Sequence, residues 1–267
     1  MNHSPDTAEA VRAAARRLAG AAETARPCAP VRDLIGADDI TAAYAVQHQL
    51  TIDRQAAGAT VTGRKIGLTS PSVQKQLGVD RPDFGVLFDE MECVDGVVPT
   101  GRLIAPKVEA EIAFVLGDDL ADGELTLHQV RSAVEYAVAA LEIVDSRILN
   151  WDITFGDTVA DNASSAKYVL GRDRRTLAEV EPKDVTMTLA VGDEVVSQGA
   201  GVECLGDPLV ALQWLARTAA ALGDPLLAGQ VILSGALGPM VAVPPGGSVT
   251  ARSSGFDEVT AVFEEVS

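Results

Sequence analysis

The stretch "PKVEAEIAFVLGDD", residues 106–119, decides how the middle of the chain folds. Apolar residues alternate along it, as is typical of a strand with one face in a hydrophobic core: Val108, Ala110, Ile112, Phe114 and Leu116. The other face carries Ala113 and Val115, but also Glu109 and Glu111. Side chains two residues apart on a strand point the same way. The stretch therefore predicts a largely apolar strand with two neighbouring carboxylates on one face.

The composition fits a soluble globular protein. The chain has 267 residues, 47% hydrophobic and 22% charged, enough for one large domain or a core domain with a smaller appendage. A net charge of −17 argues against binding to nucleic acid or to an anionic membrane. The sequence contains no run of 18 apolar residues, which predicts no transmembrane helix, and the N-terminus lacks the apolar core of a signal peptide. Three widely spaced cysteines indicate a reducing compartment, so we expect a cytoplasmic protein.

The pattern along the chain changes near residue 62. Residues 6–24 and 38–57 carry helical signals, which predicts a helical N-terminal region over 1–62. Short strand-like runs between glycines and prolines follow, which predicts a β-rich catalytic domain over 63–267. Helices are expected at about 126–140 and 208–222, and "LAVGDEVV" is typical of a hairpin. Runs of strands favour an α+β fold with a mostly antiparallel sheet or closed roll.

The paired carboxylates raise a question of charge. Burial would raise the pKa values of Glu109 and Glu111 unless a cation compensates, although an exposed face, arginine partners or a chance register would also explain them. Glu142 repeats the anomaly inside the apolar run "LEIVDSRI". Three carboxylates on strands suit Mg²⁺ or Mn²⁺, and zinc is less expected because no His or Cys lies near them in sequence. Glu142 could instead form an ion pair with Arg147 or Lys107.

Two motifs could supply cationic and acid–base groups. "GRKIGLTS", residues 63–70, places Arg64 and Lys65 at the start of a strand-like run, where a cation could bind a substrate carboxylate or polarise an enol oxygen. A solvated basic pair at a strand edge is the alternative. Asp83 follows Pro82 in "RPDFGVLFDEM" and could be a turn former only.

Two further segments could line a pocket. "FGDTVADNASSAKYVLG", residues 155–171, could do so with small polar side chains, or these could simply satisfy the backbone of a long loop: Asp157, Asp161, Asn162, Ser164 and Ser165. "LSGALGPMVAV" brings Gly235 and Gly238 to a turn whose amides could approach a carboxylate. The sequence contains no GxGxxG or GxxxxGK[ST] motif and no histidine beside a candidate nucleophile, so nucleotide cofactors and a Ser-His triad lack support.

Taken together, these motifs resemble the 2-keto-4-pentenoate hydratase family, within the fumarylacetoacetate hydrolase superfamily. The resemblance runs from about residue 35 to the end of the chain and implies a small helical N-terminal region followed by a mostly antiparallel β-roll. It also implies a homo-oligomer, a pentamer or decamer, and a divalent cation, Mg²⁺ or Mn²⁺, held by Glu109, Glu111 and Glu142. On the same basis we expect Asp83 and Lys65 to be catalytic, and the substrate contacts to come from Arg64, Asn162, Ser164, Gly235 and Gly238.

The reaction implied is the addition of water to 2-hydroxypenta-2,4-dienoate, giving 4-hydroxy-2-oxopentanoate in the meta-cleavage catabolism of aromatic compounds. The first alternative is decarboxylation of a 2-oxo-3-enedioate such as 4-oxalocrotonate. A C–C bond hydrolase would need a His-Glu arrangement, for which His48 is the candidate. A non-catalytic scaffold partner is a further alternative, and association with a neighbouring pathway enzyme is expected from the family.

Overall fold

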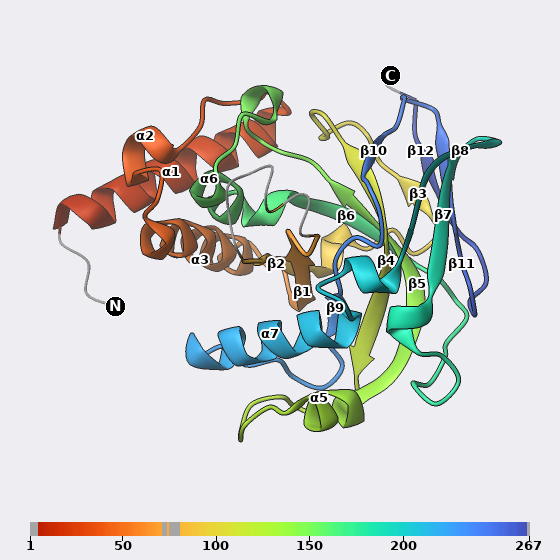
Figure 1. Ribbon diagram of the computed structural model, residues 1–267. Coiled ribbons are helices and arrows are strands. Elements are labelled where there is room, and N and C mark those ends of the chain that lie inside the picture. Colours follow the sequence, from red (N-terminus) through yellow and green to blue (C-terminus); the bar gives the residue numbers. More distant parts are fainter. Residues whose placement is uncertain (1–4, 71–73, 75–80, 266–267) are drawn as a thin grey trace.

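The computed structural model describes residues 5–70, 74 and 81–265 (Figure 1). A layer of helices lies beside two β-sheets. The helices are α1 (Pro5–Thr24), α2 (Arg32–Ile35), α3 (Ile40–Ala56), α5 (Leu127–Ala133), α6 (Phe155–Ala160) and α7 (Pro208–Ala221). None of these described helices combines the length and the hydropathy needed to cross a bilayer.

The larger sheet runs in the order β2-β1-β9-β4-β5-β6, and β10 adds a short pairing to β4. Its strands are β1 (Val61–Gly67), β2 (Asp83–Phe88), β4 (Lys107–Leu116), β5 (Val134–Val144), β6 (Ser165–Leu170), β9 (Val231–Leu233) and β10 (Val241–Ala242). All pairings are antiparallel except that of β1 with β9. The predicted strand over 106–119 is thus confirmed as β4, one of the two long central strands.

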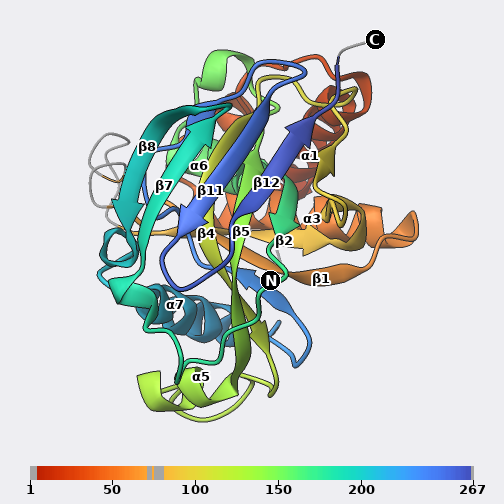
Figure 2. The ribbon, with the colours of Figure 1, turned by 90° about the vertical axis from the view of Figure 1, so that its right-hand side faces the viewer.

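The smaller sheet runs in the order β3-β12-β11-β7-β8 and covers one face of the larger sheet (Figure 2). Its strands are β3 (Val97–Val98), β7 (Thr186–Val191), β8 (Glu194–Ala200), β11 (Ser248–Ser253) and β12 (Val259–Phe263). The main core lies between the sheets, where Ile112 and Phe114 of β4 share a cluster with Leu189 and Val249. The predicted hairpin is the β7–β8 pair, and the predicted α+β class with mostly antiparallel sheets is confirmed.

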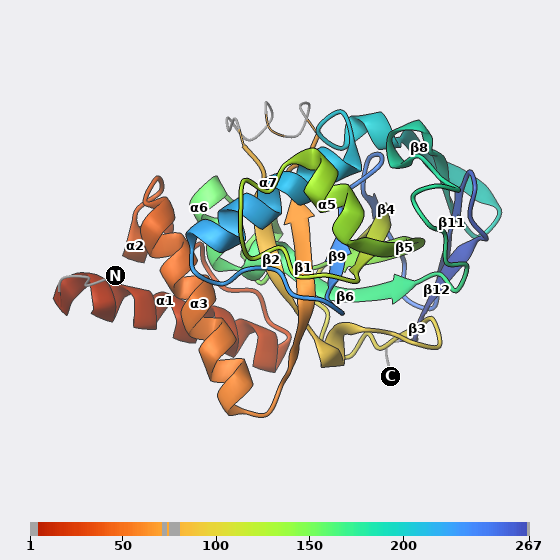
Figure 3. The same cartoon turned by 90° about the horizontal axis from the view of Figure 1, so that it is seen from below.

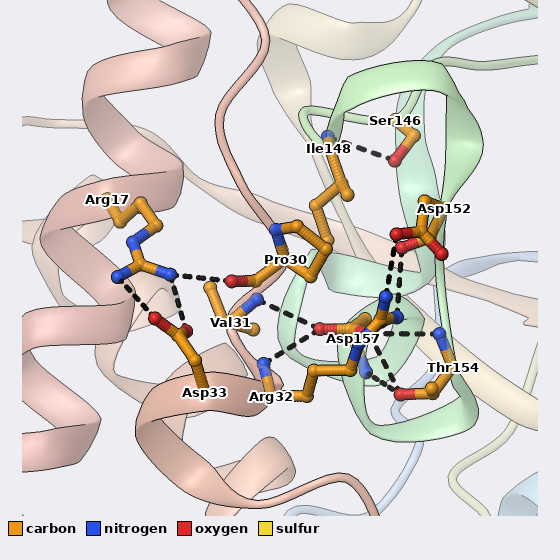
Figure 4. Close-up of polar contacts among 10 residues, drawn as sticks. All are labelled: Arg17, Pro30, Val31, Arg32, Asp33, Ser146, Ile148, Asp152, Thr154 and Asp157. Atoms are coloured by element: carbon orange, nitrogen blue, oxygen red, sulfur yellow. Dashed lines mark hydrogen bonds and ion pairs between the residues drawn. The ribbon is translucent and has the colours of Figure 1, made fainter.

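The N-terminal helices lie beside α6 (Figure 3), which shares a hydrophobic cluster with them. Asp157 is the fully buried anchor: its carboxylate accepts hydrogen bonds from the backbone N–H groups of Val31, Arg32 and Thr154 (Figure 4). The guanidinium of Arg32 lies 2.8 Å from the same carboxylate and 2.7 Å from Asp152. Asp157 therefore holds the N-terminal region against the β-rich part and does not line the cavity described below.

The structure corrects one helix boundary. The predicted helix over 126–140 ends at Ala133, and β5 begins at Val134. Residues 134–144 are rich in alanine, a strong helix former, but this segment pairs with β4 on one side and β6 on the other. Tertiary pairing thus overrides local propensity. The helical N-terminal region also ends slightly earlier than predicted, because β1 begins at Val61.

Candidate active site

The three predicted metal ligands meet at one point of the β4–β5 ladder. Glu109 on β4 lies directly opposite Glu142 on β5, and Glu111 follows two residues later on the same face. One carboxylate oxygen from each of the three lies within 4.8 Å of the others. Strand register, which the sequence alone does not contain, brings Glu142 to the Glu109–Glu111 pair.

The electrostatics of this cluster favour a bound cation. Burial and the nearby charge of Glu142 raise the pKa of Glu109 to about 7, although Lys65 opposes the shift. Burial, followed by the charges of Glu142 and Glu109, also raises the pKa of Glu111. Within the part of the chain that the structure describes, Glu111 Oε1 and Glu142 Oε2 are buried and accept no hydrogen bond. Unsatisfied carboxylate oxygens this close together fit a hard divalent cation such as Mg²⁺ or Mn²⁺.

Lys65 supplies the protein's own positive charge at this cluster. Its Nζ lies 3.1 Å from Glu142 Oε1, with only 3% of the lysine side chain and 1% of the glutamate side chain exposed. Burial would lower the pKa of Lys65, but the charges of Glu142 and Asp83 outweigh it, so the pKa is raised and the ammonium is retained. The alternative ion pairs for Glu142 are wrong. Arg147 pairs with Asp161 instead, at 2.5 Å.

Asp83 begins β2 and is paired in register with Gly67 of β1. Its Oδ2 accepts a hydrogen bond from the hydroxyl of Thr158 at 3.3 Å. Burial raises the pKa of Asp83 to about 6, and Lys65 and the Thr158 hydroxyl oppose the shift. A side chain at Gly67 would place its Cβ 2.2 Å from Asp83 Oδ1, so glycine is needed there for the carboxylate to fit. A carboxyl group titrating near neutral pH can both accept and donate a proton.

These groups border a cavity of about 260 Å³. Glu109, Lys65 and Asp83 contribute its polar wall. Apolar side chains form much of the remainder: Ile66, Leu68, Val144, Trp151, Ile153, Ala163, Ala236 and Met240. A largely apolar cavity with a few charged groups at one side is typical of a small-molecule site.

Ser164 lines this cavity, whereas Asn162 supports it from behind. Asn162 Oδ1 accepts from the Val86 backbone N–H at 2.7 Å, and its Nδ2 donates to the Val86 carbonyl at 2.9 Å. Asn162, Ala163 and Ser164 have consecutive φ values of +55°, +51° and +55°, in the left-handed region that side chains disfavour. Such strain persists only where surrounding contacts enforce it. The paired Asn162 amide provides one such contact, so we interpret this residue as structural.

Of the two predicted glycines, Gly235 lies beside the carboxylate cluster and Gly238 lies away from it. Gly235 has a φ of +109°, and its N–H donates to Glu111 Oε2 at 2.8 Å. A Cβ there would lie 2.4 Å from Thr69 Oγ1. The amide thus orients a predicted metal ligand. Gly238 packs against the second sheet, where a Cβ would lie 2.8 Å from the Gln198 carbonyl oxygen.

Arg64 is another predicted site residue that does not line the cavity. Adjacent residues on a strand point to opposite faces, so Arg64 and Lys65 of β1 cannot both face the carboxylates. The Arg64 guanidinium is paired with Asp224 and with the carbonyl oxygen of Gly63. It is a buried structural cation.

The structure adds residues that sequence reasoning did not place in the site. Thr158, Lys107 and Trp151 all line the cavity, and the Lys107 ammonium lies 4.3 Å from the centre of the Trp151 ring. Lys107 is two residues before Glu109 on β4, so the alternation of that strand was a signal for it. Thr158 and Trp151 carry no comparable signal, because irregular backbone and a short helix bring them to the site.

The chain is similar to known proteins in both sequence and fold. The family model for the fumarylacetoacetate (FAA) hydrolase C-terminal region matches residues 87–264. The chain is 53% identical over 252 residues to the "2-keto-4-pentenoate hydratase" of Burkholderia vietnamiensis, covering 94% of this chain and 96% of that one. It is 50% identical, with the same coverage, to "2-keto-4-pentenoate hydratase 2" of Dechloromonas aromatica. The solved 4-oxalocrotonate decarboxylase of Pseudomonas putida G7, complexed with magnesium and adipate, matches with a TM-score of 0.93 and 34% identity, over 98% of this chain and 100% of that one.

Proposed function

Because the chain belongs to the fumarylacetoacetate hydrolase family and, within it, to the 2-keto-4-pentenoate hydratases, we propose that it hydrates 2-hydroxypenta-2,4-dienoate to 4-hydroxy-2-oxopentanoate. The observation that carries the proposal is the cluster of Glu109, Glu111 and Glu142, which adjoins a cavity also bordered by Lys65 and Asp83. The reaction belongs to the meta-cleavage catabolism of aromatic compounds.

Glu109, Glu111 and Glu142 would hold the divalent cation. A bound Mg²⁺ or Mn²⁺ supplies Lewis-acid polarisation of the substrate's 2-oxo group. The protein contributes the geometry of the cation site. The Glu109–Glu142 register sets two ligands, and the Gly235 N–H orients the third through its bond to Glu111 Oε2.

Two steps, each with one proton lost and one gained, convert the dienol into the hydrated product. In the first, the enol O–H loses its proton and C5 gains one, which gives 2-oxopent-3-enoate. In the second, the oxygen of water bonds to C4 while water loses a proton and C3 gains one. Asp83 accepts and returns these protons, since its pKa of about 6 allows both forms near neutral pH. The Lys65 ammonium stabilises negative charge that develops on the 2-oxo oxygen.

The oxo-enedioate decarboxylase is the rival function, because a solved decarboxylase shares the fold at 34% identity. The hydratase is favoured by the higher identity, 53%, to a protein of that name over 94% of the chain. The intact carboxylate cluster argues against a non-catalytic scaffold, since such a subunit would have no need to retain three repelling charges.

We also propose a homo-oligomer, a pentamer or decamer, that works in the cytoplasm and associates with a neighbouring pathway enzyme. The family resemblance supports the assembly. The three free cysteines, Cys28, Cys93 and Cys204, are compatible with a reducing compartment. Sedimentation equilibrium would test the assembly.

The decisive experiment is to mix metal-stripped protein with freshly generated 2-hydroxypenta-2,4-dienoate and follow the diene absorbance as Mg²⁺ or Mn²⁺ is restored. We expect metal-dependent loss of absorbance with formation of 4-hydroxy-2-oxopentanoate, and none with Glu109→Gln. Glu135→Gln, which removes an exposed carboxylate from β5, is the matched control and should remain active. Folded, metal-loaded protein that leaves the dienoate unchanged but releases CO₂ from 4-oxalocrotonate would establish the decarboxylase instead.

A further inference from the structure

Lys107 occupies a defined place beside the carboxylate cluster. It lies on β4 on the same face as Glu109 and Glu111, about 7 Å along the strand from Glu109 at about 3.3 Å per residue. Its backbone is paired with Val144 of β5 on one side and Ala242 of β10 on the other. Lys107 and Val144 both line the cavity. The position of the lysine is therefore set by the same ladder that sets the metal ligands.

The side chain of Lys107 is held by an aromatic ring. Its ammonium lies 4.3 Å from the centre of the Trp151 ring. The ring itself is anchored, because Trp151 Nε1 donates to the Ala105 carbonyl oxygen at 3.1 Å. Trp151 also has a φ of +55°, an unfavourable conformation that fixes where the residue points. A cation–π contact occupies one side of the ammonium and leaves its remaining N–H donors available.

Lys107 forms no close ion pair with the described residues, although its charge opposes the rise in the pKa of Glu109 two residues away. Among the residues that the structure describes, its ammonium makes no hydrogen bond and no ion pair, whereas Lys65 is paired with Glu142. The chain carries a net charge of −17, so carboxylates are abundant. A partly buried ammonium at a cavity, with no carboxylate in direct contact, is suited to an anion that arrives with the ligand.

The position of Lys107 indicates which anion. It borders the same cavity as Glu109, beside the carboxylate cluster that fits a divalent cation, so the carboxylate of a ligand bound at that cluster can reach this lysine. We propose that Lys107, held over the indole of Trp151, binds the carboxylate group of a 2-oxo or 2-hydroxy acid in this cavity. The identity of that acid rests on the proposed function, but the place of Lys107 in the cavity does not.

Binding of a non-reactive analogue tests this inference without turnover. Isothermal titration calorimetry of the Mg²⁺-loaded protein would compare the affinity for 2-oxopentanoate with that for its neutral amide, 2-oxopentanamide. We expect Lys107→Met to weaken 2-oxopentanoate binding about 10–100-fold, the range for a hydrogen bond between charged groups, and to leave amide binding unchanged. Lys107→Arg should retain most of the affinity. Lys183→Met, which removes an exposed ammonium, should leave binding unchanged.

Three outcomes would overturn the inference: unchanged binding of 2-oxopentanoate to Lys107→Met, equal loss of acid and amide binding, or an equal loss in Lys183→Met. Circular dichroism and a Mg²⁺ titration of each variant separate these outcomes from misfolding or loss of metal, and Lys107→Gln serves if Lys107→Met does not fold. Lys107-dependent binding in a protein that leaves the dienoate unhydrated would refute the proposed reaction and retain the carboxylate site. Hydration with an unchanged KM in Lys107→Met would refute the site and retain the reaction.

Discussion

Glu109→Gln should make the metal-free protein more stable while preventing metal binding. The Glu109 carboxylate lies opposite Glu142 on the β4–β5 ladder, where burial and that neighbouring charge raise its pKa to about 7. A carboxyl group with a raised pKa favours the folded state fully only below its unfolded pKa, and that advantage is lost as the pH rises through the folded value. Above pH 7 the metal-free protein therefore bears the cost of ionising this group, and glutamine removes that cost.

The size of the effect follows from the two pKa values. A rise from 4.5 to about 7 corresponds to about 3 kcal/mol, at about 1.4 kcal/mol for each tenfold change in proton affinity. Glu109 is partly exposed, so solvent screening reduces the expected gain to roughly 2 kcal/mol. For a protein of this size that is a rise in Tm of about 4–8 °C.

Thermal unfolding in EDTA at pH 8 and at pH 4.5 measures this effect. The variant should exceed the wild type at pH 8 and match it at pH 4.5, and added Mn²⁺ should stabilise the wild type alone. Glu135→Gln on β5 is the control for a general effect of losing a carboxylate. A lower Tm for Glu109→Gln at pH 8, or a gain in Tm that does not change with pH, would show that ionised Glu109 does not destabilise the metal-free protein.

Three further predictions concern the same site. Mn²⁺ affinity should fall as the pH drops below about 7, where Glu109 takes up a proton, and binding near that pH should release protons. Calorimetric titrations in two buffers of different ionisation enthalpy would detect the released protons. An affinity that does not change with pH would contradict the prediction. Asp83→Asn should reduce the hydration rate about 10²–10⁴-fold with metal affinity retained, and a pH–rate profile should lose the limb near pH 6; an unchanged profile would exclude Asp83 as the acid–base group. Gly235→Ala should weaken Mn²⁺ binding and lower the Tm. The Cβ of the alanine would lie 2.4 Å from Thr69 Oγ1 and would displace the amide that binds Glu111. Mn²⁺ binding equal to that of the wild type would show that this turn does not position Glu111.

Helix and strand positions with a clear period could be predicted from the sequence. The alternation in residues 106–119 predicted β4 and placed Glu109 and Glu111 on one face, and helical signals predicted α1, α3 and α7. The helix expected to continue to residue 140 was wrong, because the alanines of β5 are held in a strand by two neighbouring strands. Local propensity contains no information about such neighbours.

The sequence by itself determined which residues share a face, since strand alternation is a local property of the backbone. That was enough to pair Glu109 with Glu111 and to indicate a cation between carboxylates. Only the tertiary structure decided what faces them. Strand register set Glu142 against Glu109, and the face of β1 brought Lys65 to the cluster while Arg64 points to the other side. These are contacts between segments far apart in the chain, and they depend on register and packing that no local pattern encodes.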